Sequence, residues 1–263
     1  PTVGNNCHKD ANLGMKKLIL SIFLLSLLSY CSAQETRNGL SFSLKTGLTF
    51  ANMYGPDVES ETILLGDNTD NYYANHPASD AFKTGLNVGF LVDYRFNSYI
   101  SLGLGSSYIQ KGAMINVTKH WVSDAQTYED VSGKIYWNQN FWTLELPITA
   151  YIPFEKNDVY FQVGLFTGFL IKSEEKGKIT MSEKDYKYLN DRKANKTEPG
   201  YFIRCGYIYS LPKDKGSIFA ELSWTRSIIK SSGSDMVPNP QYYYNKTISI
   251  NLGYRYNFNF TKK

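Results

Sequence analysis

The sequence has few of the residues on which reactive or cross-linked sites usually depend. Of its 263 residues, only three are cysteine and three are histidine. The cysteines lack paired spacing, which excludes a disulfide framework, and the scattered histidines leave little for a metal or acid–base site. A net charge of +4 without a basic cluster gives no reason to expect a nucleic-acid partner. We therefore expect no cofactor and no enzymatic activity.

Long apolar runs are also scarce. A mean hydropathy of -0.35 is too polar for a bundle of membrane helices, whereas 42% hydrophobic and 20% charged residues is too apolar for a disordered chain. One apolar run, 18–28, follows Met-Lys-Lys and precedes a small-x-small site that ends at Ala33. This run has 11 residues, and a membrane-spanning helix needs about 20. We therefore interpret residues 15–33 as a cleavable signal peptide.

The signal peptide sets the expected boundaries of the mature protein. Residues 1–14 precede the expected initiator methionine, and we interpret them as a start site assigned too early or a cloning scar. A lipidated Cys31 is an alternative, but Tyr30 is large where a small residue is preferred. We expect residues 34–263 to form one domain, in which Cys205 is the single remaining cysteine.

Alternation of apolar and polar residues is the dominant pattern of the mature chain. Between 247 and 260, one face is wholly apolar and aromatic, while the other carries polar residues and glycine. This period of two indicates β-strands with two different faces, and helical periodicity is nearly absent. The same pattern predicts eight strands, whose apolar faces lie within residues 40–50, 86–96, 100–108, 142–154, 159–171, 201–209, 218–224 and 248–260.

The connections between these strands alternate in length. The short connections are 97–98, 155–157 and 212–216, and the long ones are 52–81, 112–139, 173–199 and 231–245. An even number of strands with short turns at one end and long loops at the other is typical of barrels in the bacterial outer membrane. The sequence therefore predicts an all-β fold, an eight-stranded antiparallel up-and-down transmembrane β-barrel with its turns in the periplasm.

Glycine placement indicates which face of each strand points inward. The interior of a narrow barrel is crowded, and glycine makes room there for long side chains from facing strands. We therefore expect the polar face to point inward and the apolar face to meet lipid. The strand glycines in the polar register are Gly47, Gly85, Gly89, Gly103, Gly105, Gly164, Gly168, Gly206 and Gly253.

Four short segments carry a resemblance to a known family. They are Asn-Phe-Trp-Thr-Leu-Glu-Leu-Pro-Ile from 140, Lys-Thr-Gly-Leu-Thr-Phe-Ala-Asn from 45, Ser-Tyr-Ile-Gln-Lys-Gly-Ala from 107 and Gly-Tyr-Arg-Tyr-Asn-Phe from 253. With these segments, most of residues 38–260 resembles the PorT-like outer-membrane β-barrel proteins of Bacteroidetes. The namesake of that family is implicated in the secretion of surface proteases by the type IX system. The resemblance implies outer-membrane lipid, lipopolysaccharide and secretion-system or other envelope proteins as partners.

Charged residues recur in the inward register. They could line a polar path for ions or form a salt-bridged plug, and the plug is favoured because eight strands leave space only for side chains. We expect Lys45, Glu221 and Arg255 to lie at similar depths, with Glu145 and Arg204 nearer the outer rim. The inward charges are Lys45, Asp93, Arg95, Lys111, Glu145, Arg204, Glu221 and Arg255.

Two rival functions depend on other features. An outer-membrane hydrolase would use an Asp/His pair at the rim to activate water, with His76 and Asp80, or His120 and Asp124, as candidates. Histidines in loops are more often merely solvated. A soluble lipocalin-like barrel would place its apolar face inward around a ligand, but here the glycines share the polar face.

The long loops suggest two further features. The acidic segment 52–81 could collect divalent cations, although a solvated loop is the preferred interpretation. In the third long loop, Ser182 precedes two acidic residues, and this N-cap pattern predicts a short helix that ends near Arg192.

Overall fold

The computed structural model describes residues 38–66, 72–76, 78–122, 125–212, 215–229 and 242–258. The chain divides into two units, Pro1–Arg37 and Asn38–Lys263, and only the second contains described residues. The expected leader 1–14, the signal peptide 15–33 and its cleavage site therefore lie outside the described residues. Within the described part, no helix is long and apolar enough to cross a membrane.

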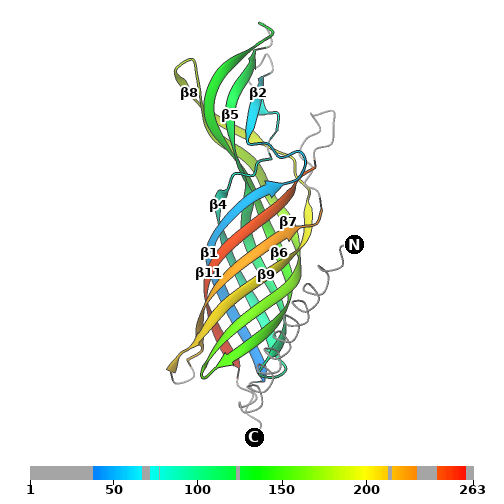
Figure 1. Ribbon diagram of the computed structural model, residues 1–263, viewed down its shortest axis with the longest axis vertical. Helices are drawn as coiled ribbons and strands as arrows, with labels where there is room; N and C mark the ends of the chain where they lie inside the picture. The colour runs from blue at the N-terminus through cyan, green and yellow to red at the C-terminus, as the bar shows by residue number, and fades with distance from the viewer. Residues whose placement is uncertain are drawn as a thin grey trace, which may run out of the picture. The chain divides into compact units, whose positions relative to one another are not determined.

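Eight antiparallel strands close into a ring (Figure 1). Each strand pairs with the next along the ring, and β1 pairs with both β4 and β11, which closes it. A closed ring leaves no strand edge exposed to lipid. The prediction of an eight-stranded up-and-down β-barrel is confirmed. In ring order the strands are β1 (Gly39–Tyr54), β4 (Lys83–Arg95), β5 (Ile100–Val122), β6 (Thr127–Phe154), β7 (Asn157–Met181), β9 (Thr197–Ser210), β10 (Ser217–Ser227) and β11 (Tyr244–Phe258).

The two faces of the barrel strands differ as the alternation predicts. On β11, Leu252 is 63% exposed while its neighbour Asn251 is fully buried. The outward register is apolar along the other barrel strands as well, which suits contact with lipid chains. Aromatic pairs flank this apolar band. Tyr54 stacks on Tyr244 with ring centroids 5.2 Å apart near the long-loop end, and Tyr94 meets Phe96 edge-on at 5.2 Å near the short turns.

The short connections occur where they are expected. β4 and β5 are separated by residues 96–99, β6 and β7 by 155–156, and β9 and β10 by 211–216. Glu155 adopts a positive φ of 53°, which tightens the β6–β7 turn. Residues 230–241 of the last long connection lie outside the described residues.

The predicted long loops 112–139 and 173–199 are wrong, because most of their residues form strands, and the predicted loop 52–81 also contains two short strands. β5 and β6 stay paired up to Val122 and Thr127, and β7 continues to Met181, so three barrel strands run on beyond the apolar band. The shorter strands β2 (Glu61–Gly66), β3 (Tyr72–Ala74) and β8 (Lys184–Asp191) join them. The resulting sheet has the order β3-β2-β5-β6-β7-β8, with β2 parallel to β5. We call this sheet the extension; its upper strands are labelled in Figure 1.

The helix predicted from Ser182 to Arg192 is also wrong. Ser182 and Glu183 both have positive φ, 47° and 64°, and they form a tight turn between β7 and β8. Two consecutive positive φ values are the geometry of a type I′ hairpin turn. Tyr188 on β8 is buried in the hydrophobic core of the extension, and this burial outweighs the local capping pattern.

Two hydrophobic clusters hold the extension together. The larger one fills its interior and consists of Leu64, Ala74, Ile115, Val117, Val131, Ile135, Ile179, Met181 and Tyr188. The smaller one joins the extension to β1 and to the residue just before β11, and it contains Met53, Ala78, Ala113, Trp137 and Tyr243. The extension is therefore a packed structure rather than a set of loops.

A glycine marks the point where β5 leaves the barrel. Gly112 has a φ of +122°, and a Cβ atom there would lie 1.8 Å from the carbonyl oxygen of Trp137. Only glycine meets both requirements without strain. Close by, the pairing of β6 with β7 shifts register between Asn140 and Phe141, and such irregularities bend strands.

Candidate functional site

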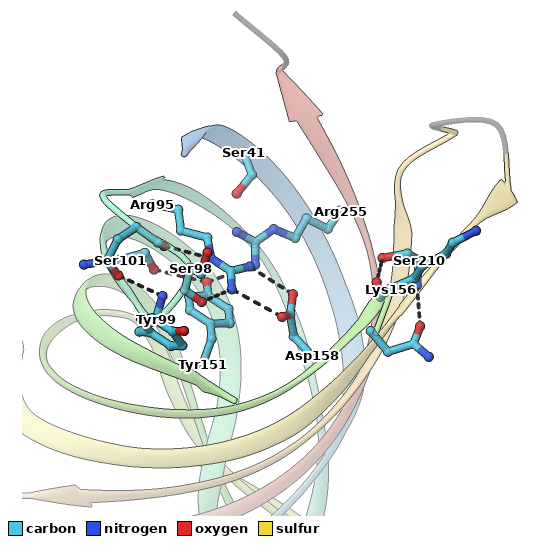
Figure 2. Close-up of polar contacts among 12 residues, drawn as sticks. Ser41, Arg95, Ser98, Tyr99, Ser101, Tyr151, Lys156, Asp158, Ser210 and Arg255 are labelled. Atoms are coloured by element: carbon cyan, nitrogen blue, oxygen red, sulfur yellow. Dashed lines mark hydrogen bonds and ion pairs between the residues drawn. The ribbon is translucent and has the colours of Figure 1, made fainter. Parts of the chain in front are cut away.

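The charged side chains of the inward register form three layers inside the barrel. The layer nearest the short turns, drawn in Figure 2, is centred on Tyr151. Arg95 binds both oxygens of Asp158, at 2.9 and 3.2 Å, and its guanidinium lies 3.9 Å from the centroid of the Tyr151 ring. Arg255 donates to the Tyr151 hydroxyl at 3.0 Å and to Asp93 at 2.8 Å. Two arginines thus balance two aspartates.

Asp93 is the most heavily bonded carboxylate of this turn-end layer. It accepts hydrogen bonds from Ser41, from Ser101 at 3.1 Å and from the Tyr151 hydroxyl at 3.0 Å, besides the bond from Arg255. A buried carboxylate needs such donors because desolvation of an unpaired charge is costly. The layer therefore closes the barrel at its short-turn end.

The central layer contains two carboxylates and two cations. Glu145 lies 3.4 Å from Lys45 and 2.8 Å from Arg204. Glu221 lies 3.8 Å from Lys45 and 3.7 Å from Arg204, so each carboxylate meets both cations. Glu221 also accepts hydrogen bonds from Tyr160 at 2.9 Å and Asn251 at 3.0 Å. All four charged side chains are buried.

The third layer lies where the barrel meets the extension. Lys111 and Glu198 form an ion pair at 2.5 Å, and the Lys111 ammonium is 4.4 Å from the centroid of the Phe166 ring. Asn245 donates to Glu198 and, at 2.8 Å, to Gln139. Lys111 and Glu198 balance each other, but a second buried lysine, Lys83, donates to the Lys111 carbonyl at 3.5 Å and meets no carboxylate among the described residues. This layer therefore contains one lysine more than it has carboxylates.

The spaces between these layers are small. A cavity of about 30 Å³ lies between the turn-end and central layers and is lined by Tyr151, Arg255, Lys45 and Glu221. Another, of about 10 Å³, lies between the central layer and Lys111. One water molecule needs about 10 to 15 Å³ of such space. The larger cavity therefore has room for two or three water molecules and the smaller for at most one, and the central ion pairs separate the two cavities.

The structure corrects two details of the predicted pairing. Lys45 does meet Glu221, but Arg255 pairs with Asp93 in the turn-end layer. Glu145 and Arg204, both expected nearer the outer rim, meet Lys45 and Glu221 in the central layer. Alternation identifies which side of a strand points inward, whereas the stagger between strands decides which inward residues meet.

A second set of polar contacts closes the extension on itself. Arg192 donates to Glu175 at 3.0 Å and to the Ala74 carbonyl at 2.9 Å, and so connects β7 to β3. The Tyr188 hydroxyl donates to Glu175 at 2.7 Å and accepts from the Ala74 amide at 3.0 Å. Burial raises the pKa of the Glu175 carboxyl, while Arg192 and the Tyr188 bond oppose the shift. Sequence reasoning missed Glu175 because it lay in an expected loop.

The outer surface of the extension carries an unusual row of lysines. Lys134, Lys178 and Lys187 stand directly opposite one another on β6, β7 and β8. Directly opposed like charges destabilise a sheet. Lys178 forms an ion pair with Asp185 at 2.6 Å, which offsets its repulsion from the neighbouring lysines. Lys134 and Lys187 meet no carboxylate among the described residues. We call this surface the lysine face; it also includes Tyr136, Lys176 and Leu189 on the adjacent row.

The two histidines of the candidate hydrolase pairs lie beside a glutamate and a tyrosine. The ring of His76 lies 3.7 Å from Glu59, and the His120 ring packs edge-on against Tyr72 with centroids 5.0 Å apart. Asp124 lies outside the described residues. Among the described histidine, cysteine and acidic residues, no group of three could hold a metal ion.

Comparison with known families finds one match that spans nearly the whole chain. The model of the family described as "Outer membrane protein beta-barrel domain" matches residues 32–262. The match covers every described strand. Among curated proteins, none matches the chain.

Several solved outer-membrane proteins are similar to the chain at low sequence identity. OprG from Pseudomonas aeruginosa is 12% identical, with 84% of this chain and 97% of that chain covered and a TM-score of 0.43. Neisserial surface protein A is 11% identical, with coverages of 84% and 99% and a TM-score of 0.39. Ail from Yersinia pestis is 13% identical, with coverages of 84% and 100% and a TM-score of 0.33.

Proposed function

The chain belongs to the outer membrane protein β-barrel domain family, and from that premise we propose that it is a non-enzymatic accessory of the cell envelope. In this proposal the barrel anchors the extension, and the extension presents the lysine face to an acidic partner protein. Protein secretion is the process to which the resemblance to PorT-like proteins points. Because outer-membrane barrels have short periplasmic turns and longer extracellular loops, we take the extension to lie outside the cell.

The interior of the barrel supports an anchor rather than a channel. The charges within the turn-end and central layers balance, and the cavities between layers have room for only a few water molecules. Eight strands enclose only enough space for side chains. We therefore expect no steady ion conductance from the protein in planar bilayers. Stable open-channel currents would contradict the anchor.

The single observation that carries the proposal is the continuity of β5, β6 and β7. These strands run without interruption from the barrel into the extension, where they enclose a hydrophobic core. A binding surface built on rigid strands is held more precisely than one built on loops. The extension can therefore present a defined surface to another protein.

The charge of the lysine face indicates the chemistry of its partner. Lys134 and Lys187 stand in one row with Lys178 and lack carboxylate partners among the described residues. Complementary potentials speed association and exclude wrong partners. Tyr136 and Leu189, both exposed on the same surface, add apolar area of the kind that anchors protein interfaces. An acidic protein surface with an apolar centre fits these features.

Site-specific photo-crosslinking in living cells tests the proposal. A photoreactive amino acid replaces Tyr136 in the full chain, and crosslinked products are identified by mass spectrometry. We expect crosslinking to one predominant acidic envelope protein. The yield of this product should fall about tenfold or more in Lys134→Glu/Lys187→Glu, because repulsion between like charges at an interface costs a few kcal/mol. The matched control is Lys119→Glu, an exposed lysine of β5 outside the lysine face.

The pattern of yields decides the outcome. An unchanged yield in the charge-reversed protein would show that the lysine face does not select the partner. An equal loss in Lys119→Glu would show a general charge effect. Either result would overturn the proposed role of this face.

A further inference from the structure

The lipid-facing register of the barrel ends in positive charge at the long-loop edge. Within the barrel part of these strands, as far as the structure describes them, charged residues of the outward register occur only at this edge, as Lys172 on β7, Arg226 on β10 and Lys246 on β11. Trp224 and Ile248, the next outward residues toward the membrane, are aromatic and apolar. These cations therefore stand at the height where lipid chains give way to headgroups.

Arg226 and Lys246 form a like-charged pair, which we call the girdle pair. They are directly opposite each other on β10 and β11, an arrangement that destabilises a sheet. Among the described residues, neither meets a carboxylate. Lys172 at the same edge differs, because its ammonium lies 2.7 Å from Glu174. The girdle pair is therefore the part of this edge at which positive charge is left without a protein counter-ion.

Aromatic side chains hold Arg226 in place. Its Nε donates to the Tyr54 hydroxyl at 2.5 Å, and its guanidinium carbon lies 4.2 Å from the centroid of the Tyr54 ring. Tyr54 in turn stacks on Tyr244. A guanidinium carries five N–H donors. The bond to Tyr54 uses one of them, and the hydroxyl of Tyr201, opposite Arg226 on β9, accepts from another. The aromatic contacts thus fix the side chain and leave donors on its two terminal nitrogens.

We propose that the girdle pair binds a phosphate group of a glycolipid in the outer leaflet. Arginine recognises phosphate through two parallel hydrogen bonds, and lysine adds a compact second charge. The phosphate supplies the negative charge that the protein does not, and the tyrosines pack against the sugar and the upper part of the acyl chains. The assignment to the outer leaflet rests on the proposed function, in which the extension lies outside the cell. Phosphate binding by the girdle pair does not depend on the lysine face or its partner.

Native mass spectrometry of the full chain in nanodiscs tests this site. The nanodiscs contain zwitterionic phosphatidylcholine with a small amount of lipid A, either phosphorylated or dephosphorylated. We expect the wild-type protein to retain phosphorylated lipid A when it is released into detergent. In Arg226→Gln/Lys246→Gln, retention should fall about tenfold or more, because each cation near a membrane surface contributes about 1 kcal/mol. Lys172→Gln is the matched control and should behave as wild type.

Three outcomes would overturn the proposal. They are equal retention by the double variant, equal retention of dephosphorylated lipid, and displacement of the lipid by inorganic phosphate at equal concentration. The last would indicate a general phosphate site rather than a lipid site. Electrophoresis without boiling, in which a folded barrel migrates differently, verifies that each variant has folded. Loss of lipid with unchanged crosslinking at Tyr136 would separate this site from the proposed partner surface.

Discussion

The barrel and the extension share strands, but their apolar residues lie on opposite faces. They point outward in the barrel and inward in the extension. β6 keeps the same inward register throughout, yet its inward residues change from Glu145 in the barrel to Ile135 and Val131 in the extension. Its outward residues change in the reverse sense, from Leu146 to Lys134. The exchange occurs near Asn140, where the register of β6 against β7 also shifts.

The difference shows that the surrounding solvent determines which face of a strand is apolar. In the membrane, the outer face must be apolar and the crowded interior can hold paired charges. In water, the same strand gains stability by burying its apolar side chains. One chain therefore builds a polar interior in the barrel and an apolar core in the extension without interrupting its strands. A substitution that is costly in one region should be mild at a matching position in the other.

The largest effect is expected from an uncompensated charge in the barrel. Glu221→Ala leaves Lys45 and Arg204 with one carboxylate between them, and a broken buried pair costs about 3 to 5 kcal/mol. Glu129→Ala, at an exposed position of the extension, should change stability by less than about 0.5 kcal/mol. Folding titrations into lipid vesicles measure both. Near-equal stabilities would mean that water screens the interior charges.

The junction between the two regions should be nearly as sensitive. Gly112→Ala places a Cβ atom 1.8 Å from a carbonyl oxygen at a φ of +122°, and we expect a loss of about 3 kcal/mol or more. At Gly168, the nearest atom to an added Cβ is 3.2 Å away on the Phe141 side chain, so Gly168→Ala serves as the control. Hydrogen exchange should show increased opening of the extension in Gly112→Ala while the barrel stays protected. Unchanged exchange would show that this glycine is dispensable.

A third prediction compares outward positions on one strand. Leu146→Arg places a charge against lipid and should cost about 2 to 4 kcal/mol. Tyr136→Arg, ten residues earlier in the same register of β6, should cost less than about 1 kcal/mol because that side chain faces water. Folding titrations of both variants compare them directly. Equal costs would place the two positions in the same environment and contradict the change in polarity.

Much of the barrel could be predicted because lipid imposes a uniform rule. Alternation identified the strands, and the glycines of the polar register identified the inward face. The glycines also explain where inward aromatic residues fit, because a Cβ on Gly253 would lie 2.2 Å from the Phe219 ring and one on Gly206 would lie 2.5 Å from the Tyr160 ring.

The extension could not be predicted by the same rule. Residues 112–139 still alternate, but their apolar residues occupy the inward positions. In the sequence alone, this change in polarity looks like the end of a strand. The partners of the inner charges were uncertain for another reason. Whether Arg255 meets Glu221 or Asp93 depends on the stagger between strands, which local sequence does not encode.

The smallest effect is expected from the buried carboxyl of the extension. Burial raises the pKa of Glu175 above its ordinary value of 4.5, so the folded extension binds this proton more tightly than the unfolded one does. The stabilisation from that proton is fully present below pH 4.5 and is lost as the pH rises through the folded pKa. Wild-type stability should therefore fall over this interval relative to Glu175→Gln, whose amide does not titrate.

Hydrogen exchange of the β7–β8 amides, corrected for the intrinsic pH dependence of exchange, measures this difference. Tyr188→Phe removes a hydrogen bond that lowers the pKa of Glu175, so the fall should move to higher pH. That variant also leaves the Ala74 amide without its partner, which lowers stability at every pH but does not move the interval. The amides of the barrel strands provide an internal reference, because their protection should not follow Glu175. The opposite result would be wild-type stability that rises with pH over this interval, relative to Glu175→Gln. It would show that the ion pair with Arg192 lowers the pKa of Glu175 more than burial raises it.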